Sequence, residues 1–116
     1  MALAIVVPAL QPLPPLVQIV GRLAGMGFDR IVIVDDGSGE SHREVFSACA
    51  EFPGVDVLRH PENLGKGAAL KTGIRHVLSV CPDVEGVVTA DADGQHDPAD
   101  IASVAAKLTE LPGRLD

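Results

Sequence analysis

The hydrophobic positions along the chain follow two alternating patterns. Short apolar runs, which are typical of β-strands, lie at residues 3–7, 31–34, 55–59 and 87–90. Apolar residues that recur every three or four positions, as on one face of a helix, lie between and after these runs, at residues 16–23, 70–78 and 101–108. The run 31–34 is apolar on both faces, which predicts a central strand, whereas 55–59 alternates as an edge strand would.

Capping and turn residues mark where the helices begin. Residues 41–44, Ser-His-Arg-Glu, have the form of a capping box and predict a helix that starts there and runs through Cys49. A third helix is expected to start near Gly65 or Gly67, and the pair Asp97-Pro98 to open a fourth.

The order β-α-β-α-β-α-β-α predicts the α/β class, with one domain over residues 1–116. Such alternation favours an open, mostly parallel sheet that is covered by helices and joined by right-handed crossovers. In sheets of this type, ligands bind at the carboxyl ends of the strands. The side chains that follow the second and fourth strands are therefore the first candidates for a functional site.

Two pairs of acidic residues stand at these strand ends. Asp91 and Asp93 follow the fourth strand, where alternate side chains share a face, so both carboxylates can meet one Mg²⁺ or Mn²⁺ ion. The alternative is a polar turn that caps the next helix. Asp35 and Asp36 follow the second strand and are expected to accept hydrogen bonds from a nucleobase or ribose, with a solvated turn as the alternative. We expect Asp36 to be a carboxylate at the solvent edge that supports no core packing.

The glycine-rich segment 63–67, Asn-Leu-Gly-Lys-Gly, does not form a Walker loop, because Gly67 stands where serine or threonine belongs. It still places backbone amides and Lys66 at a helix start, which attracts anions. A phosphate contact and a plain helix start both remain open for Lys66. His42, His60 and His76 are scattered along the chain, and we interpret them as surface or cap residues.

Composition narrows the classes of partner. The net charge of −7 and the absence of Trp and Tyr argue against nucleic acid as a partner, because no basic face or set of stacking rings is evident. Cys49 and Cys81 lack metal-ligand spacing and are expected to be reduced thiols in or near the core. The longest apolar run, 2–10, is too short to span a bilayer, so the expected location is the cytoplasm, including the cytoplasmic face of a membrane.

Four motifs in order resemble those of the family 2 glycosyltransferases, and in particular the dolichyl- or polyprenyl-phosphate sugar transferases. The motifs are Val-Val-Pro at 6–8, Val-Asp-Asp-Gly-Ser at 34–38, Asn-x-Gly-Lys-Gly-x-Ala at 63–69 and Asp-Ala-Asp-Gly-Gln-His-x-Pro at 91–98. The resemblance implies a GT-A type domain, of which this chain would be the Rossmann-like, nucleotide-sugar-binding half.

The resemblance also implies roles for particular residues. Asp36 would hold the base of the nucleotide, with Asp35 beside it, and Pro8 and Ala9 would line the pocket. The remaining implied contacts come from the fourth motif: Asp91, Ala92 and Asp93 would contact the nucleotide-sugar, and Asp91, Asp93 and Gln95 would bind the divalent metal. The metal would neutralise the charge of the leaving nucleoside diphosphate.

The implied reaction is inverting, metal-assisted transfer of a sugar to an acceptor, for which a polyprenyl phosphate is a candidate. Two departures from the family pattern matter: Leu10-Gln11 replaces a polar pair after the first strand, and the chain is about half the usual domain length. The general base is therefore expected outside this chain. The alternatives are a nucleotidyltransferase or a noncatalytic nucleotide-binding fragment.

Two further expectations follow from the chain being about half the usual domain length. The chain alone should bind donor without transferring sugar. Its fourth strand, which carries Val87 and Val88, should present an apolar edge, and self-association is expected there or on the fourth helix.

Overall fold

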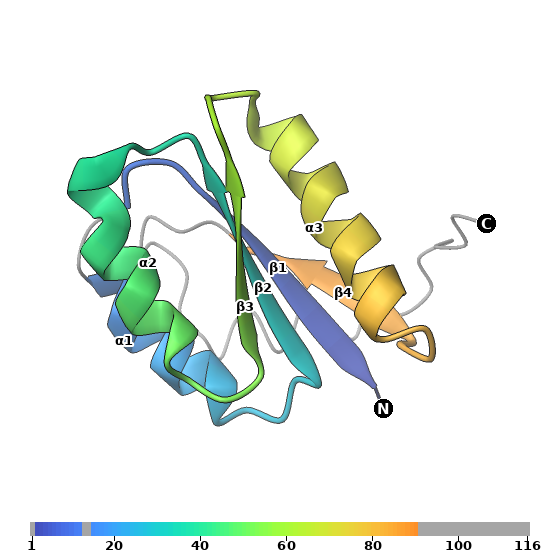
Figure 1. Cartoon of the computed structure of the whole chain (residues 1–116). Helices are drawn as coiled ribbons and strands as arrows, with labels where there is room; N and C mark the ends of the chain where they lie inside the picture. The colour runs from blue at the N-terminus through green and yellow to red at the C-terminus, as the bar shows by residue number, and fades with distance from the viewer. Residues whose placement is uncertain (1, 13–14, 91–116) are drawn as a thin grey trace.

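The structure of the protein is a computed structural model, which describes residues 2–12 and 15–90. These residues form a four-stranded parallel sheet in the order β3-β2-β1-β4, with helices on both faces (Figure 1). The strands are β1 (Leu3–Ala9), β2 (Arg30–Asp36), β3 (Val55–His60) and β4 (Gly86–Thr89). The helices are α1 (Pro15–Ala24), α2 (Arg43–Ala50) and α3 (Lys66–Val80), and a short 3-10 helix, η1 (Glu40–His42), precedes α2.

The predicted α/β class is confirmed, and so are the positions of two strands. β2 pairs with both β1 and β3, as expected for a strand that is apolar on both faces, and β3 lies at the edge of the sheet. β4 pairs with β1 alone among the strands of residues 2–12 and 15–90. The predicted fourth helix and the residues that follow Ala90 lie outside the described residues.

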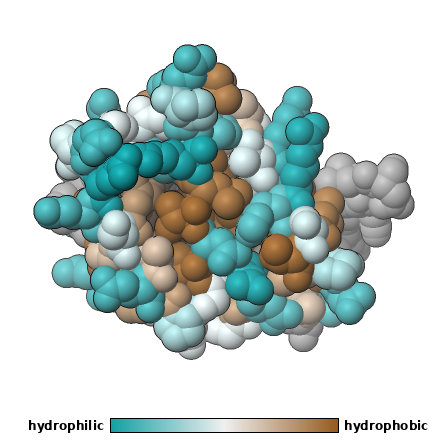
Figure 2. Space-filling view, viewed as in Figure 1, coloured by the Kyte–Doolittle hydropathy of each residue, from teal (hydrophilic) through white to brown (hydrophobic). Residues whose placement is uncertain are grey.

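The core has two parts, one on each face of the sheet. Successive residues of a strand point to opposite faces, so β1 and β2 each supply both parts. Ile5, Val7, Ile31 and Ile33 pack with α1 and α2, whereas Ala4, Val6, Val32 and Val34 pack with α3. Figure 1 shows the corresponding layers: α1 and α2 lie together on one face, and α3 covers the other. In the same view, Figure 2 shows apolar side chains gathered over the strands between these helices and framed by hydrophilic ones.

A glycine lets α3 lie close to the sheet. A Cβ on Gly73 would overlap the side chain of Val6 and lie 3.2 Å from Val34 Cγ2. The third helix begins at Lys66, after Gly65 with φ of 103°, which agrees with the predicted start. This close packing brings the polar side chains of α3 within reach of the strand ends.

The start of α2 differs from the predicted capping box. Ser41 lies within η1, α2 begins at Arg43, and the N-cap residue His42 makes no side-chain capping hydrogen bond. The His42 ring instead lies with Nδ1 3.1 Å from the carbonyl oxygen of Ser38. The capping-box prediction was wrong because the turn after β2 continues into a 3-10 helix, which takes up the residues that the motif would have used.

Both cysteines are free, as predicted. Cys49 is buried in the core on the α1 and α2 side, and burial raises the pKa of its thiol to about 11. Cys81 is partly buried and packs at the end of α3. Among the helices in the described part of the chain, none is long and apolar enough to cross a membrane.

Candidate functional site

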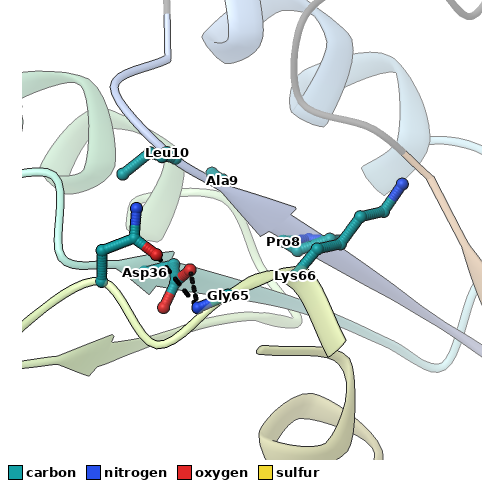
Figure 3. Close-up of a pocket in the computed structure, with 7 residues that line it drawn as sticks. Pro8, Ala9, Leu10, Asp36, Gly65 and Lys66 are labelled. Carbon is teal, nitrogen blue, oxygen red and sulfur yellow. Dashed lines mark hydrogen bonds between the residues drawn. The ribbon is translucent and has the colours of Figure 1, made fainter. Parts of the chain in front are cut away.

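A cavity of about 360 Å³ lies at the carboxyl edge of the sheet, where ligands bind in folds of this type. It is bounded by the end of β1, the end of β2 and the segment that leads into α3 (Figure 3). The lining residues are Pro8, Ala9, Leu10, Asp36, Asn63, Gly65 and Lys66. The cavity thus gathers four of the residues that the sequence singled out: Pro8, Ala9, Asp36 and Lys66.

Asp36 is held in the wall of this cavity by hydrogen bonds to both of its carboxylate oxygens. Its Oδ1 accepts hydrogen bonds from the backbone N–H of Leu64 at 2.9 Å and lies 2.8 Å from Nδ1 of His60. Its Oδ2 accepts a hydrogen bond from the backbone N–H of Gly65 at 3.0 Å (Figure 3). The carboxylate is therefore held in one orientation by donors from β3 and from the loop before α3.

These contacts set the charge of Asp36. Burial by itself raises the pKa of the carboxyl, but the hydrogen bonds from His60, Leu64 and Gly65 outweigh burial and hold the pKa below its ordinary value of 3.8. Asp36 is thus an anion at neutral pH, with only 4% of its surface exposed. The expectation of a solvent-edge carboxylate was wrong, because the loop 62–65 folds back over the end of β2 and covers it.

His60 was interpreted as a surface or cap residue, and this interpretation was wrong. The residue is 8% exposed and lies opposite Asp36 in the pairing of β2 with β3. Its Nε2 is 2.8 Å from Oγ1 of Thr72 on α3. The sequence did carry a signal for the contact between His60 and Asp36, since the two residues closely follow the β-prone runs 55–59 and 31–34, and side chains at the ends of paired strands meet. The strand order, however, had to be known first.

Asp35 lies beside Asp36 in the sequence but points to the opposite face of the sheet. It is buried, and its Oδ1 accepts a hydrogen bond from the backbone N–H of Ser38 at 2.8 Å. The hydroxyl oxygen of Ser38 in turn accepts a hydrogen bond from the backbone N–H of Gln11 at 2.8 Å. Asp35 therefore shapes the turn after β2 and ties it to the turn after β1, and it is not among the residues that line the cavity.

Gly37 allows the loop before α3 to reach Asp36. Its φ is +80°, and a Cβ at this position would overlap the Asn63 nitrogen and the Glu62 carbonyl carbon. Only a residue without a side chain permits this approach of two backbones. The loop then enters α3 through Gly65, and Figure 3 shows the side chain of Lys66 extending away from Asp36 on the side of Pro8.

The predicted metal ligands Asp91, Asp93 and Gln95, together with Ala92, lie outside the described residues. The described chain ends at Ala90, whose backbone N–H donates to the carbonyl oxygen of Val6 at 3.1 Å. This residue is at the same carboxyl edge as the cavity. Within residues 2–12 and 15–90, no group of three or more His, Cys, Asp or Glu side chains is arranged to hold a metal ion.

Comparison with known proteins identifies the family. Residues 4–113 match the model of glycosyl transferase family 2, and the chain belongs to that family. A UDP-N-acetylglucosamine–dolichyl-phosphate N-acetylglucosaminyltransferase of Methanococcus voltae is 31% identical over 113 residues, which cover 86% of this chain and 44% of that enzyme. The chain spans less than half the length of the first curated relatives that it matches.

Two solved structures share the fold at low sequence identity. S. aureus TarS in complex with UDP-GlcNAc is 19% identical, with a TM-score of 0.69 over 91% of this chain and 30% of that one. Glucosyl-3-phosphoglycerate synthase from Mycobacterium tuberculosis, in complex with Mn²⁺, UDP and glucosyl-3-phosphoglycerate, is 20% identical, with a TM-score of 0.63 over 98% of this chain and 39% of that one. The expected GT-A type arrangement of sheet and helices is thereby confirmed.

Proposed function

We propose that this chain binds a nucleotide-sugar and serves as the donor-binding part of a glycosyltransferase domain. The observation that carries the proposal is the cavity at the carboxyl edge, which is lined by Pro8, Ala9 and Asp36, the implied nucleotide contacts, and by Lys66, the candidate phosphate contact. Its volume of about 360 Å³ falls within the range of small-molecule sites, roughly 300–1,000 Å³. Membership of glycosyl transferase family 2 supports the same assignment.

Within this proposal, different lining residues bind different parts of the nucleotide. Asp36 is a fixed anion and accepts an N–H of the nucleobase. Pro8 and Ala9 offer apolar surface to the base and ribose at the end of β1. Lys66 and the amide-rich start of α3 supply positive charge for the diphosphate.

A divalent metal fits the donor set that the sequence provides after β4. Asp91, Asp93 and Gln95 offer oxygen ligands, which Mg²⁺ and Mn²⁺ prefer, and Ala90 leads into them at the carboxyl edge. When bound, such an ion neutralises the charge that develops on a departing diphosphate. The Mn²⁺ in the complex of the glucosyl-3-phosphoglycerate synthase supports this choice of metal.

The proposed reaction of the whole protein is inverting transfer of the sugar to a polyprenyl phosphate at a membrane surface. An acceptor phosphate is already ionised, so it needs little help from a general base. The name of the Methanococcus voltae relative, a dolichyl-phosphate N-acetylglucosaminyltransferase, supports a lipid-phosphate acceptor. Self-association through the edge of β4 stays a prediction, to be checked by sedimentation.

Calorimetry with nucleoside diphosphates tests the proposal. UDP, GDP and dTDP are titrated into the chain with and without Mn²⁺, and at least one is expected to bind more tightly with the metal. Asp93→Ala should abolish this gain, whereas Asp83→Ala, which alters an exposed carboxylate before β4, should keep it. A chain that binds none of the three nucleotides contradicts the proposed donor site. Equal affinity with and without Mn²⁺ contradicts the metal site alone.

A further inference from the structure

His60 and Thr72 connect Asp36 to the body of the protein on the face covered by α3. Nδ1 of His60 lies 2.8 Å from Oδ1 of Asp36, and Nε2 lies 2.8 Å from Oγ1 of Thr72. The three side chains come from β2, β3 and α3. They therefore form a continuous chain of hydrogen bonds from the middle of a helix to a wall of the cavity.

The direction of one hydrogen bond in this chain is fixed by chemistry. An ionised carboxylate only accepts hydrogen bonds, so Nδ1 of His60 carries a hydrogen and donates a hydrogen bond to Asp36. If the ring is neutral, Nε2 accepts a hydrogen bond from the hydroxyl group of Thr72. If the ring is charged, Nε2 donates a hydrogen bond to that hydroxyl oxygen. In both cases, Thr72 anchors the far side of the ring and keeps the Nδ1 proton directed at Asp36.

This arrangement leaves a defined part of Asp36 for a ligand. His60 and Leu64 both donate to Oδ1, and Gly65 donates to Oδ2. Each carboxylate oxygen has two lone pairs, so the described contacts fill Oδ1 and leave acceptor capacity on Oδ2. Because Asp36 lines the cavity, that remaining capacity is available at the cavity wall.

We infer that His60 is a positioning residue, anchored by Thr72, which fixes the Asp36 carboxylate so that Oδ2 accepts an N–H of the nucleobase. The inference rests on the proposed donor site and adds a residue that orients the carboxylate for the base. A carboxylate that is free to rotate would meet the base N–H in only a fraction of its orientations, and ordering it would oppose binding. His60 and the backbone N–H groups of Leu64 and Gly65 together remove this cost before the ligand arrives, and His60 is the one side chain among these three donors.

Two substitutions at His60 separate its two hydrogen bonds. His60→Asn places an amide N–H near the position of Nδ1, so it keeps the donor to Asp36 and loses the contact with Thr72. His60→Gln reaches the position of Nε2, so it keeps the contact with Thr72 and loses the donor to Asp36. Both variants remove the ring from the same buried place and should cost similar stability, which makes each the control for the other.

The test measures affinity for the tightest-binding nucleoside diphosphate among UDP, GDP and dTDP, with Mn²⁺ present. His60→Gln should weaken binding by about 10-fold or more, as expected for one hydrogen bond to a charged group, whereas His60→Asn should stay within about 3-fold of the unmodified chain. Affinity for inorganic pyrophosphate should be the same in all three, because the inferred effect concerns the base. Thr72→Ser should behave as the unmodified chain, and Thr72→Val should weaken nucleotide binding.

Each outcome decides a different claim. If the unmodified chain binds none of the nucleotides, the proposed donor site fails and this inference fails with it. If it binds a nucleotide but the two His60 variants lose affinity equally, or lose pyrophosphate affinity as well, His60 is only a structural support and the donor site stands. Affinity that is unchanged in His60→Gln also overturns the inference.

Discussion

Replacing Gly37 with alanine should break the contact that holds the candidate site together. The new Cβ would overlap the backbone at Glu62 and Asn63, so the loop before α3 must move away from the end of β2. This loop supplies the backbone N–H groups of Leu64 and Gly65 to Asp36. We therefore expect Gly37→Ala to lower both the stability of the fold and the affinity for a nucleotide.

The matched control is Gly27→Ala, because Gly27 has a similar φ of +91° and no atom within 4 Å of the added Cβ. An alanine at positive φ costs about 1–2 kcal/mol in either place, partly offset by a less flexible unfolded chain. A hydrogen bond to a charged group contributes about 1.5–3 kcal/mol. Losing one of the two bonds to Asp36 makes Gly37→Ala about 2 kcal/mol less stable than the control, and losing both makes it about 4 kcal/mol less stable.

Urea unfolding followed by far-ultraviolet circular dichroism measures this difference, since the chain has no Trp or Tyr whose fluorescence would report it. Nucleotide titration at low temperature, where the folded fraction of both variants is verified first, supplies the second readout. If the free energies of unfolding of the two variants agree within about 0.5 kcal/mol, the loop before α3 tolerates a side chain at position 37. That result would refute the claim that Gly37 is needed for the contact with Asp36.

Three further measurements follow from the structure. Gly73→Ala should destabilise the fold by about 1–3 kcal/mol because its Cβ overlaps valine side chains of the sheet, whereas Gly67→Ala, with nothing within 4 Å, should be neutral or stabilising; similar urea midpoints would contradict this. Iodoacetamide near pH 8 should modify Cys81 and spare Cys49, whose pKa of about 11 and burial protect it, and equal rates by mass spectrometry would contradict that. Because the pKa of Asp36 is lowered in the folded state, its charge stabilises the fold above pH 3.8 and less as pH falls below that value. The stability gap between the unmodified chain and Asp36→Asn should therefore narrow from about pH 5 to about pH 3, and a constant gap would count against the assignment.

The sequence alone determined the class of fold and the edge of the sheet that carries the cavity. Apolar runs of four or five residues are typical of buried strands, and the helical period between them is typical of helices that cover a sheet, so the hydrophobic pattern favours a parallel α/β arrangement. Parallel strands all end at one edge, and this places Pro8, Asp36 and the start of α3 near each other. The glycines of the motifs were visible in the sequence, but the close backbone contact that requires Gly37 was not.

Tertiary structure decided which side chains act together. The sequence presents Asp35 and Asp36 as a pair, but neighbouring strand residues face opposite sides of a sheet, so Asp35 joins the turn at Ser38 while Asp36 joins His60. His60 meets Asp36 only because β3 lies beside β2, and it meets Thr72 only because α3 packs closely on that face. Strand order and helix approach depend on contacts between residues far apart in the chain, and local hydrophobic pattern does not contain them.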